Sequence, residues 1–273
     1  MFWQVIFLAI VQGVTEFLPV SSSGHLLLTQ RLLECGGFPP LDEPLSLGIL
    51  LHCASLFAIL FYFWRPVLRM VRGEDNRLLA LLVVGSVPVG IVGVCAKLFF
   101  DEFLEKNLFS NVSFAGLMLV LTGVLLVVAQ KIIMLNPQYY KERNWRVNLK
   151  NISLFKAFCV GCVQALAILP GLSRSGSTIT AGLLAGLKKN DAATFSFLLA
   201  IPAIAGAGLV ECLKLSREGL GDIPFFPLAS GFVVCFVVSF ASLVFLVQLV
   251  KKRRIGIFAW YLIPVGLLVF FLG

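Results

Sequence analysis

The chain has 273 residues, of which 59% are hydrophobic and only 13% charged, and its mean hydropathy is strongly positive. This composition excludes an ordinary soluble globular protein and predicts a chain whose solvent is lipid. The net charge of +8 could indicate a nucleic-acid partner, but the placement of the basic residues favours membrane topology as its cause, so no nucleic acid is expected.

Six apolar runs reach the roughly 20 residues that a helix needs to cross a hydrocarbon core. In chain order they are residues 46–64, 78–96, 112–129, 194–210, 225–250 and 255–272. The first stretch of the chain begins apolar at Phe2 and has no basic segment, so we expect it to be retained rather than cleaved as a signal peptide. The expected fold class is an all-α, polytopic helical bundle in a membrane.

The segments that connect the apolar runs fall into two sets with opposite charge balance. One set holds fifteen lysines and arginines against four acids: 65–77, 130–153, 187–193 and 251–254. The alternate set holds five basic residues against nine acids: 30–44, 97–111 and 211–224. By the positive-inside rule the first set is cytoplasmic and the second external, which predicts a multi-pass protein of the cell membrane.

Two polar segments interrupt the apolar sequence, QGVTEFLPVSSSGH from Gln12 and QALAILPGLSRSGST from Gln164. Each has an apolar run that carries Gln, then Leu-Pro, a serine cluster and Gly, and the distance from Gln to Gly is twelve residues in both. Proline removes a backbone donor, and serine and glycine favour a turn, so each segment predicts a helix, break, helix hairpin. Non-helical backbone at membrane depth is tolerated where it lines a wet cavity, so the two breaks mark the candidate site.

Three spans follow each hairpin, and this odd number makes the second hairpin enter from the side opposite to the first. We therefore expect six spans plus two re-entrant hairpins in an inverted repeat, about 1–135 and 150–273, within a single domain of residues 1–273. With the charge assignment above, hairpin one enters from outside and hairpin two from the cytoplasm.

The start of the inner half-helix in the second hairpin is a candidate anion site. Free N–H groups at a helix N-terminus attract phosphate, and an arginine adds a planar fork of donors. The candidate phosphate-binding residues are Ser173, Arg174, Ser175, Gly176 and Thr178. The alternatives are an arginine that caps backbone carbonyls and a purely structural ion pair with Glu16, since an arginine at membrane depth needs an anionic partner.

The first hairpin carries groups for metal and proton chemistry. Gln12 and Glu16 are four residues apart on one helical face, and their oxygens suit a hard divalent cation, Mg²⁺ or Ca²⁺. Ser22 and His25 then offer a nucleophile and a proton carrier. His52, in the span 46–64, could line the same cavity or form a hydrogen-bonded packing contact, and the sequence does not separate the two.

These two segments resemble the signature motifs of a known family. The pattern from Gln12 to His25 and the pattern from Pro170 to Thr178 are similar to those of the bacterial undecaprenyl-diphosphatases, also called bacitracin-resistance proteins. The resemblance covers essentially the whole chain. It implies a plasma-membrane enzyme that hydrolyses undecaprenyl pyrophosphate to the monophosphate, recycles the lipid carrier for peptidoglycan synthesis, uses a divalent metal and opens its active site to the external face.

Position by position, the resemblance assigns the metal motif to Gln12 and Glu16, the essential serine and histidine to Ser22 and His25, and the arginine to Arg174. Many members have Glu where this chain has Gln12, so a site with two carboxylates is absent and Glu16 must do more of the work. The family also varies between Gln and His at the position of His52.

The expected partners are membrane lipids and a polyprenyl pyrophosphate substrate, and the sequence leaves open whether copies of the chain form a homo-oligomer. Whether Ser22 or a water attacks the terminal phosphorus, with His25 or Glu16 handling the proton, is also open. A transporter or lipid flippase is the rival function class, because inverted repeats with broken helices are typical of transporters. A structural scaffold of cell-wall synthesis would leave Glu16 and Arg174 unexplained.

Overall fold

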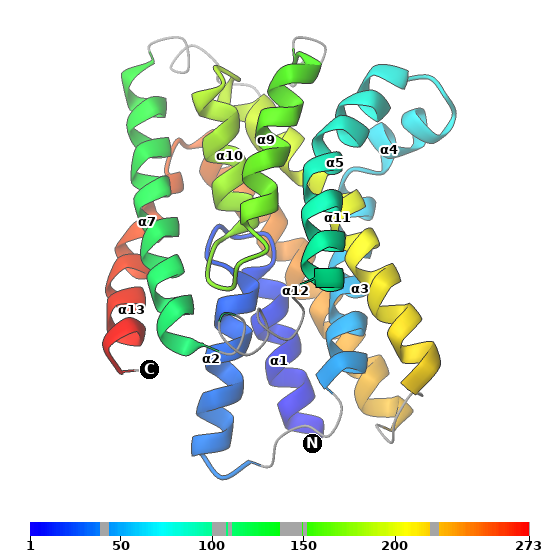
Figure 1. Cartoon of the computed structure of the whole chain (residues 1–273), viewed down its shortest axis with the longest axis vertical. Helices are drawn as coiled ribbons and strands as arrows, with labels where there is room; N and C mark the ends of the chain where they lie inside the picture. The colour runs from blue at the N-terminus through cyan, green and yellow to red at the C-terminus, as the bar shows by residue number, and fades with distance from the viewer. Residues whose placement is uncertain are drawn as a thin grey trace.

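A computed structural model describes residues 1–38, 44–99, 108, 111–136, 149, 152–218 and 224–272. The described chain is built from helices, and Figure 1 shows them as one upright bundle. In chain order they are α1 Phe2–Thr15, α2 Ser22–Cys35, α3 Pro44–Tyr62, α4 Trp64–Val71, α5 Asn76–Phe99, α7 Val112–Leu135, α9 Leu154–Leu166, α10 Arg174–Leu184, α11 Lys189–Glu218, α12 Phe225–Lys251, the 3-10 turn η3 Ile255–Phe258 and α13 Ala259–Leu272.

Five helical stretches of the described residues are long and apolar enough to cross a membrane. They are Asn76–Ala96, Val112–Leu135, Lys189–Val210, Phe225–Lys251 and Ile255–Leu272. The helices α3 and α4, whose axes differ by 86° at Phe63, pass the same test only when the bent pair is counted as one span. The five spans and α3 lie where the hydropathy of the sequence predicts apolar runs, so the predicted all-α polytopic bundle is confirmed.

The remaining apolar helices form two hairpins. The helices α1 and α2 are joined by a break at residues 16–21, and α9 and α10 by a break at residues 167–173. In Figure 1 the α1–α2 hairpin enters from the end of the bundle that carries the N-terminus, and α9–α10 enters from the other end. This is the arrangement that the count of spans predicts for the hairpins, while the exact bounds of the two repeats and the single-domain assignment stay predictions.

Local sequence explains why each hairpin breaks where it does. Ser21 ends the first break with φ of 70°, and Gly171 lies in the second with φ of 88°, both in the left-handed region. Ser21 and Ser173 then cap the inner helices, since their side chains accept hydrogen bonds from the N–H groups of Gly24 and Gly176. Serine is a preferred residue at a helix N-cap, so both inner helices begin at defined positions.

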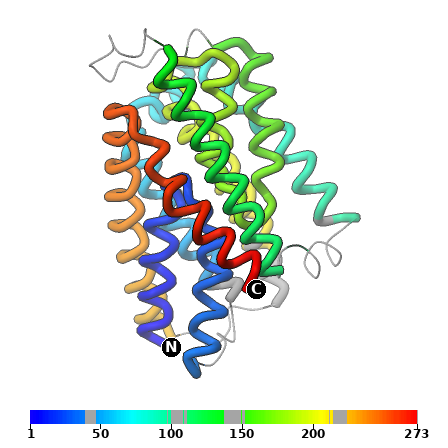
Figure 2. Tube along the Cα trace, turned by 90° about the vertical axis from the view of Figure 1, so that its left-hand side faces the viewer, coloured from blue at the N-terminus to red at the C-terminus, as the bar shows by residue number. Residues whose placement is uncertain are grey.

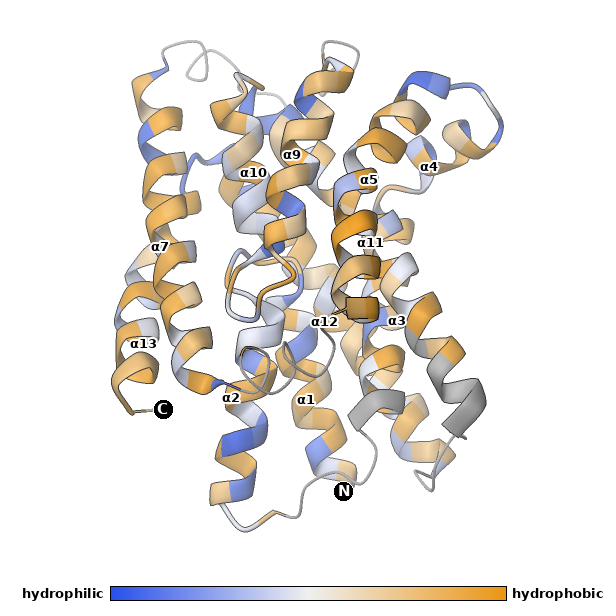
Figure 3. Ribbon diagram, viewed as in Figure 1, coloured by the Kyte–Doolittle hydropathy of each residue, from blue (hydrophilic) through white to orange (hydrophobic). Residues whose placement is uncertain are grey.

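Apolar and hydrophilic residues are distributed in the bundle as expected for a protein surrounded by lipid. Many large apolar side chains of the described helices are exposed. In Figure 3 the hydrophilic residues lie mainly toward the ends of the bundle and in its centre. The basic turns between α3 and α5 and between α12 and η3 lie at the end opposite the N-terminus (Figures 1 and 2). The helices pack most extensively in three pairs, α7 with α13, α5 with α9 and α1 with α12, so the first helix of each hairpin packs against a spanning helix.

Candidate active site

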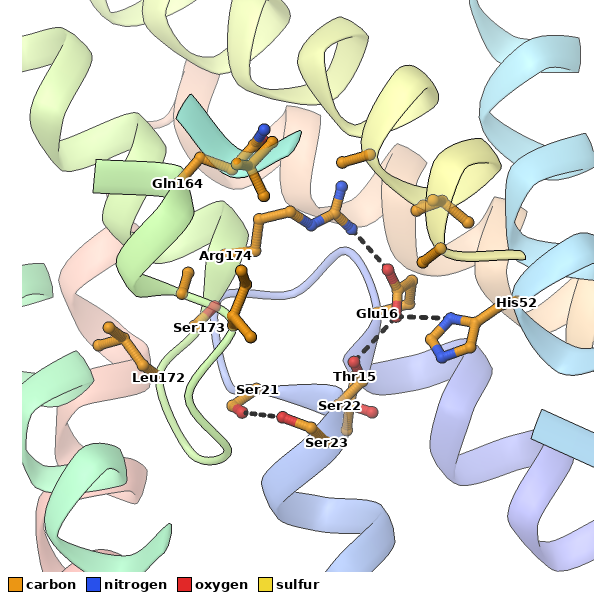
Figure 4. Close-up of a pocket in the computed structure, with 16 residues that line it drawn as sticks. Thr15, Glu16, Ser21, Ser22, Ser23, His52, Gln164, Leu172, Ser173 and Arg174 are labelled. Atoms are coloured by element: carbon orange, nitrogen blue, oxygen red, sulfur yellow. Dashed lines mark hydrogen bonds and ion pairs between the residues drawn. The ribbon is translucent and has the colours of Figure 1, made fainter. Parts of the chain in front are cut away.

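The two hairpin breaks meet inside the bundle. A Cβ added to Gly24 would lie 3.0 Å from Cα of Gly171, and one added to Gly176 would lie 3.3 Å from Cβ of Pro19, so the hairpins touch through their glycines. A pocket of about 290 Å³ opens beside this contact. Both hairpins line it, and α3, α5 and α11 contribute the rest of its wall (Figure 4).

Glu16 is the centre of the pocket's polar network. It directly follows α1 and is only 7% exposed. Its Oε1 accepts a hydrogen bond from Arg174 Nη2 at 2.5 Å, and its Oε2 accepts hydrogen bonds from Ser22 Oγ at 2.8 Å and Gln12 Nε2 at 2.9 Å. A buried carboxylate is stable only when such donors replace water, so Glu16 is held as an ion in one orientation.

Arg174 reaches Glu16 from the first residue of α10, 158 positions away in the sequence. One guanidinium nitrogen, Nη2, is used by the carboxylate, while Nη1 is buried and has no hydrogen-bond partner among the described residues. The guanidinium is a planar fork of donors that matches phosphate geometry. The free donor at a helix N-terminus is therefore suited to an anion that enters the pocket.

Ser22 is the hydroxyl best placed for chemistry. It is the first residue of α2, it lines the pocket, and its Oγ donates to Glu16 Oε2. The neighbours Ser21 and Ser23 also line the pocket, with their Oγ atoms 3.3 Å apart (Figure 4). A hydroxyl hydrogen-bonded to a carboxylate has the geometry in which a general base can activate a nucleophile.

His52 of α3 joins this network. Its Nδ1 lies 3.2 Å from Gln12 Nε2 and 3.9 Å from Glu16 Oε2, and the ring lines the pocket. The sequence left open whether His52 lines the cavity or forms a hydrogen-bonded contact, and in the structure it does both. The imidazole can place a further positive charge near Glu16 when it is protonated.

His25, in contrast, lies away from the pocket. Its Nδ1 is 2.8 Å from the backbone oxygen of Ser21, and its Nε2 is 2.9 Å from the hydroxyl of Tyr261 in α13. Both ring nitrogens are thus occupied, and His25 does not line the pocket. The geometry does not bring the predicted proton carrier to Glu16 and Ser22. Tyr261 carried no signal in the sequence, because only the packing of α13 places it beside α2.

The candidate phosphate-binding residues divide into two groups. Ser173 and Arg174 line the pocket. Gly176 N–H donates to Ser173 Oγ at 3.2 Å, and Thr178 Oγ1 donates to the backbone oxygen of Arg174 at 2.7 Å. Gly176, Thr178 and Ser175 are buried outside the pocket lining, where they hold the start of α10 together.

A threonine that the sequence did not single out holds the second break in place. Thr122 of α7 is fully buried, accepts a hydrogen bond from the backbone N–H of Ser173 at 2.9 Å, and lies with its Oγ1 3.1 Å from the backbone oxygen of Gly171. Because Ser173 precedes Arg174, this contact helps to set the direction of the guanidinium. Thr122 lies in an apolar span, so nothing in its local sequence marks it.

The donors for a divalent metal are few. Among the residues that the structure describes, no group of three or more His, Cys, Asp or Glu side chains is close enough to hold a metal ion. Glu16 is the carboxylate among the described residues that line the pocket. Gln12 does not line the pocket; its Nε2 is turned toward Glu16, and its Oε1 is buried with no hydrogen-bond partner among the described residues. A cation at Glu16 would therefore take few protein ligands and complete its shell from phosphate and water, as Mg²⁺ usually does.

The fold and the site together define a class: a polytopic helical membrane protein with two opposed hairpins and a buried carboxylate–guanidinium site that can receive an anion. Comparison with known proteins gives the family. The family model described as "Bacitracin resistance protein BacA" matches residues 5–268. The chain therefore belongs to the BacA family.

Curated relatives match this chain over nearly the whole length of both sequences. An undecaprenyl-diphosphatase of Rhodopirellula baltica is 41% identical over 271 residues, covering 99% of this chain and 97% of the relative. Proteins of the same name from Halothermothrix orenii and Bacteroides thetaiotaomicron are each 37% identical, covering 99% and 97% of this chain and 98% and 97% of the relatives.

Proposed function

We propose that this protein is an undecaprenyl-diphosphatase, which hydrolyses undecaprenyl pyrophosphate to undecaprenyl phosphate and inorganic phosphate. The reaction recycles the lipid carrier of peptidoglycan synthesis and underlies the bacitracin resistance for which the family is named. The observation that carries the proposal is the Glu16–Arg174 pair in the wall of a pocket in the hydrophobic bundle, with Nη1 of Arg174 unpartnered among the described residues. Membership of the family and the names of the relatives support the same activity.

Positive charge converges on the pocket from both hairpins. The helix α2 begins at Ser22 and α10 at Arg174, and both residues line the pocket. A helix N-terminus carries a partial positive charge and unsatisfied N–H groups. Two such ends and a guanidinium create a preorganised field for a diphosphate, and phosphoryl transfer depends mainly on positioning and electrostatic stabilisation.

In our proposed mechanism Ser22 is the nucleophile. Its Oγ attacks the terminal phosphorus while its proton passes to Glu16 Oε2, to which it already donates. The bond from phosphorus to the bridging oxygen breaks, and undecaprenyl phosphate leaves with the bonding electrons and the proton from Glu16. Glu16 then takes a proton from the water that attacks the phosphoserine and returns it to Ser22 Oγ, which releases inorganic phosphate.

Arg174 stabilises this reaction in two ways. It keeps Glu16 ionised and oriented through Nη2, and it offers Nη1 to the charge that develops on the phosphoryl oxygens. For His25, whose ring bridges α2 and α13, we propose a positioning role at the start of α2. Fixing the first turn of α2 fixes the hydroxyl of Ser22.

We further propose that Mg²⁺ or Ca²⁺ takes part, held by Glu16 and by Oε1 of Gln12, which has no hydrogen-bond partner among the described residues. When bound, the ion would neutralise charge on the diphosphate. The pocket's remaining wall is apolar, with Val89 of α5 and Ala203 and Ala207 of α11. We propose that the prenyl chain leaves the pocket past these residues and stays in the surrounding lipid.

The proposed location is the plasma membrane, with the pocket serving the external face and the basic turns on the cytoplasmic side. This orientation is supported by the charge bias between the two ends of the bundle, which follows the positive-inside rule.

The deciding experiment is phosphate release from a prenyl pyrophosphate by the purified protein with Mg²⁺ or Ca²⁺ present. We expect release by the wild type, loss of release in Arg174→Ala, and full release in Arg72→Ala, whose arginine is exposed at the end of α4. A wild type that releases no phosphate, or a fully active Arg174→Ala, would overturn the assignment. Rapid quenching followed by mass spectrometry should find phosphate on Ser22, and hydrolysis without a phosphoenzyme would point to direct attack by water.

A further inference from the structure

Gln164 is a buried polar residue whose amide has no hydrogen-bond partner among the residues that the structure describes. It lies near the end of α9, is 2% exposed, and lines the pocket with Arg174. Both Nε2 and Oε1 lack a partner. Burying an amide without hydrogen bonds costs free energy, so an unpartnered amide that lines a cavity indicates a group that binds there.

The two hairpins differ at this point. Gln12 and Gln164 hold the same place in the two matching segments, twelve residues before Gly24 and Gly176. One turn after Gln12 stands Glu16, which accepts a hydrogen bond from the Gln12 amide. One turn after Gln164 stands the apolar Ile168, so this amide has no carboxylate of its own. Its donor is left for a ligand.

The neighbours of Gln164 indicate which part of a diphosphate it would meet. In Figure 4 Gln164 lies on the opposite side of Arg174 from Ser22. Ala167 and Ile168, which follow Gln164 in the chain, and Val89 of α5 line the same pocket, so this side of the pocket is apolar. The phosphate attacked by Ser22 must lie near Ser22, whereas the phosphate bonded to the prenyl chain must lie toward apolar wall.

We propose that Gln164 binds the lipid-linked phosphate of the substrate, the group that becomes the leaving monophosphate. Its Nε2 donates to an oxygen of that phosphate, Arg174 Nη1 donates beside it, and Oε1 accepts from a water in the pocket. This inference rests on the proposed diphosphatase activity and adds a specificity: the site distinguishes the two phosphates, one held at Ser22 and the other at Gln164.

The first test compares activity with stability. Gln164→Leu removes the amide at similar volume, and we expect kcat/KM to fall roughly 10- to 100-fold, the effect of losing a hydrogen bond to a charged group. The thermal midpoint of the purified protein should stay the same or rise, because the variant no longer buries an unpaired amide. A second variant, Gln164→Asn, keeps the amide but withdraws it by one methylene, and it should lose activity as well.

Gln130→Leu is the matched control. The amide of Gln130 in α7 donates to the backbone oxygen of Arg253 at 2.8 Å and accepts from the N–H of Gly256 at 2.9 Å, away from the pocket. We expect the reverse pattern there, with a lower thermal midpoint and an unchanged kcat/KM for the folded fraction. A lower midpoint or loss of folded protein in Gln164→Leu would reveal a structural partner for its amide and overturn the inference.

The closing experiment uses the two products as probes. Farnesyl phosphate carries a lipid-linked phosphate, and inorganic phosphate mimics the released one. In Gln164→Leu the inhibition constant of farnesyl phosphate should rise roughly tenfold or more, while that of inorganic phosphate should change less than about twofold. Equal changes for both probes, or no change, would overturn the inference while the wild type stays active. A wild type that releases no phosphate would overturn the proposed function and this inference with it.

Discussion

Glu16 and Arg174 form an ion pair although 158 positions separate them in the chain. Each belongs to a different hairpin, and the two hairpins enter the bundle from opposite ends. The pair forms only when both breaks reach the same depth in the bundle, so it depends on the correct packing of both hairpins. It also explains how an arginine and a carboxylate are accommodated inside an apolar bundle, since each is the counter-ion of the other.

Arg174→Lys should separate charge from geometry. Lysine keeps the positive charge opposite Glu16 but lacks the planar fork that reaches Glu16 and a phosphate at once. We expect kcat/KM for a prenyl pyrophosphate to fall roughly 10²- to 10³-fold, as for the loss of one preorganised donor. The folded yield should remain close to that of the wild type, because the ion pair survives. Near-normal activity of this variant would show that Arg174 acts as a point charge only.

Thr122→Val tests how the second break is held. Valine has nearly the shape of threonine but cannot accept the hydrogen bond from Ser173 N–H. Since that donor is buried, we expect a loss of about 1–3 kcal/mol of stability and a drop in kcat of the folded protein, as Arg174 loses its fixed direction. Unfolding in detergent and phosphate release measure the two effects. Thr122→Ser retains the hydroxyl and should retain most of the activity.

Tyr261→Phe tests the link between α13 and the start of α2. The variant loses only the hydroxyl that contacts His25 Nε2. One hydrogen bond contributes about 0.5–1.5 kcal/mol, so kcat/KM should fall by less than about tenfold. His25→Ala also loses the contact with Ser21, so its kcat/KM should be lower than that of Tyr261→Phe. If Tyr261→Phe were as inactive as Ser22→Ala, the tyrosine hydroxyl would have to take part in the chemistry itself.

Gly161→Ala should weaken the crossing of α9 with α5. A Cβ at this position would collide with the backbone carbonyl of Gly85, which cannot move aside as a side chain can. We expect a loss of roughly 1–3 kcal/mol, measured as a lower thermal midpoint. Gly90→Ala on α5 is the control, because its Cβ would enter open space. That substitution should raise stability by about 0.5–1 kcal/mol through helix propensity.

Removal of divalent metal should lower activity, and the response should depend on Gln12. A chelator should reduce phosphate release by the wild type, and Mg²⁺ or Ca²⁺ should restore it. Gln12→Glu adds a second carboxylate beside Glu16 and should lower the metal concentration needed for half-maximal activity several-fold, since affinity rises with ligand charge. Gln12→Leu should raise the metal concentration needed for half-maximal activity. Activity that is unaffected by chelation in all three proteins would refute the metal proposal.

Much of the fold could be predicted from the sequence, because lipid imposes strict rules on a chain. Five of the six predicted apolar runs form helices long enough to cross a membrane, and the run that begins at residue 46 forms α3, which bends into α4 near the end of that run. Pro19 and Pro170 marked the hairpin breaks because each is followed by serines and glycine, which favour a turn. Proline alone was not sufficient, since Pro88, Pro202 and Pro264 lie inside helices. The contents of the breaks also named Glu16, Ser22 and Arg174, which the structure brings together.

Tertiary structure alone decided which polar groups face the pocket. From the sequence, the residues around Arg174 were predicted to bind phosphate. In the structure, Gly176 and Thr178 instead form hydrogen bonds within the start of α10. His25 read as a proton carrier, and the packing of α13 turns its ring toward Tyr261. His52 and Thr122 come from α3 and α7, and their contacts with the breaks depend on how those helices lie in space.

The physical reason for this division is the range of the interactions. Hydropathy, helix breaking and charge bias act within one segment, so the sequence by itself determined the bundle, the two breaks and the residues at their centre. The direction of a side chain depends on neighbours that are distant in the chain. Only the folded bundle therefore decided that Arg174 meets Glu16, that His25 turns away, and that Gln164 lies in the pocket wall with an amide that has no partner among the described residues.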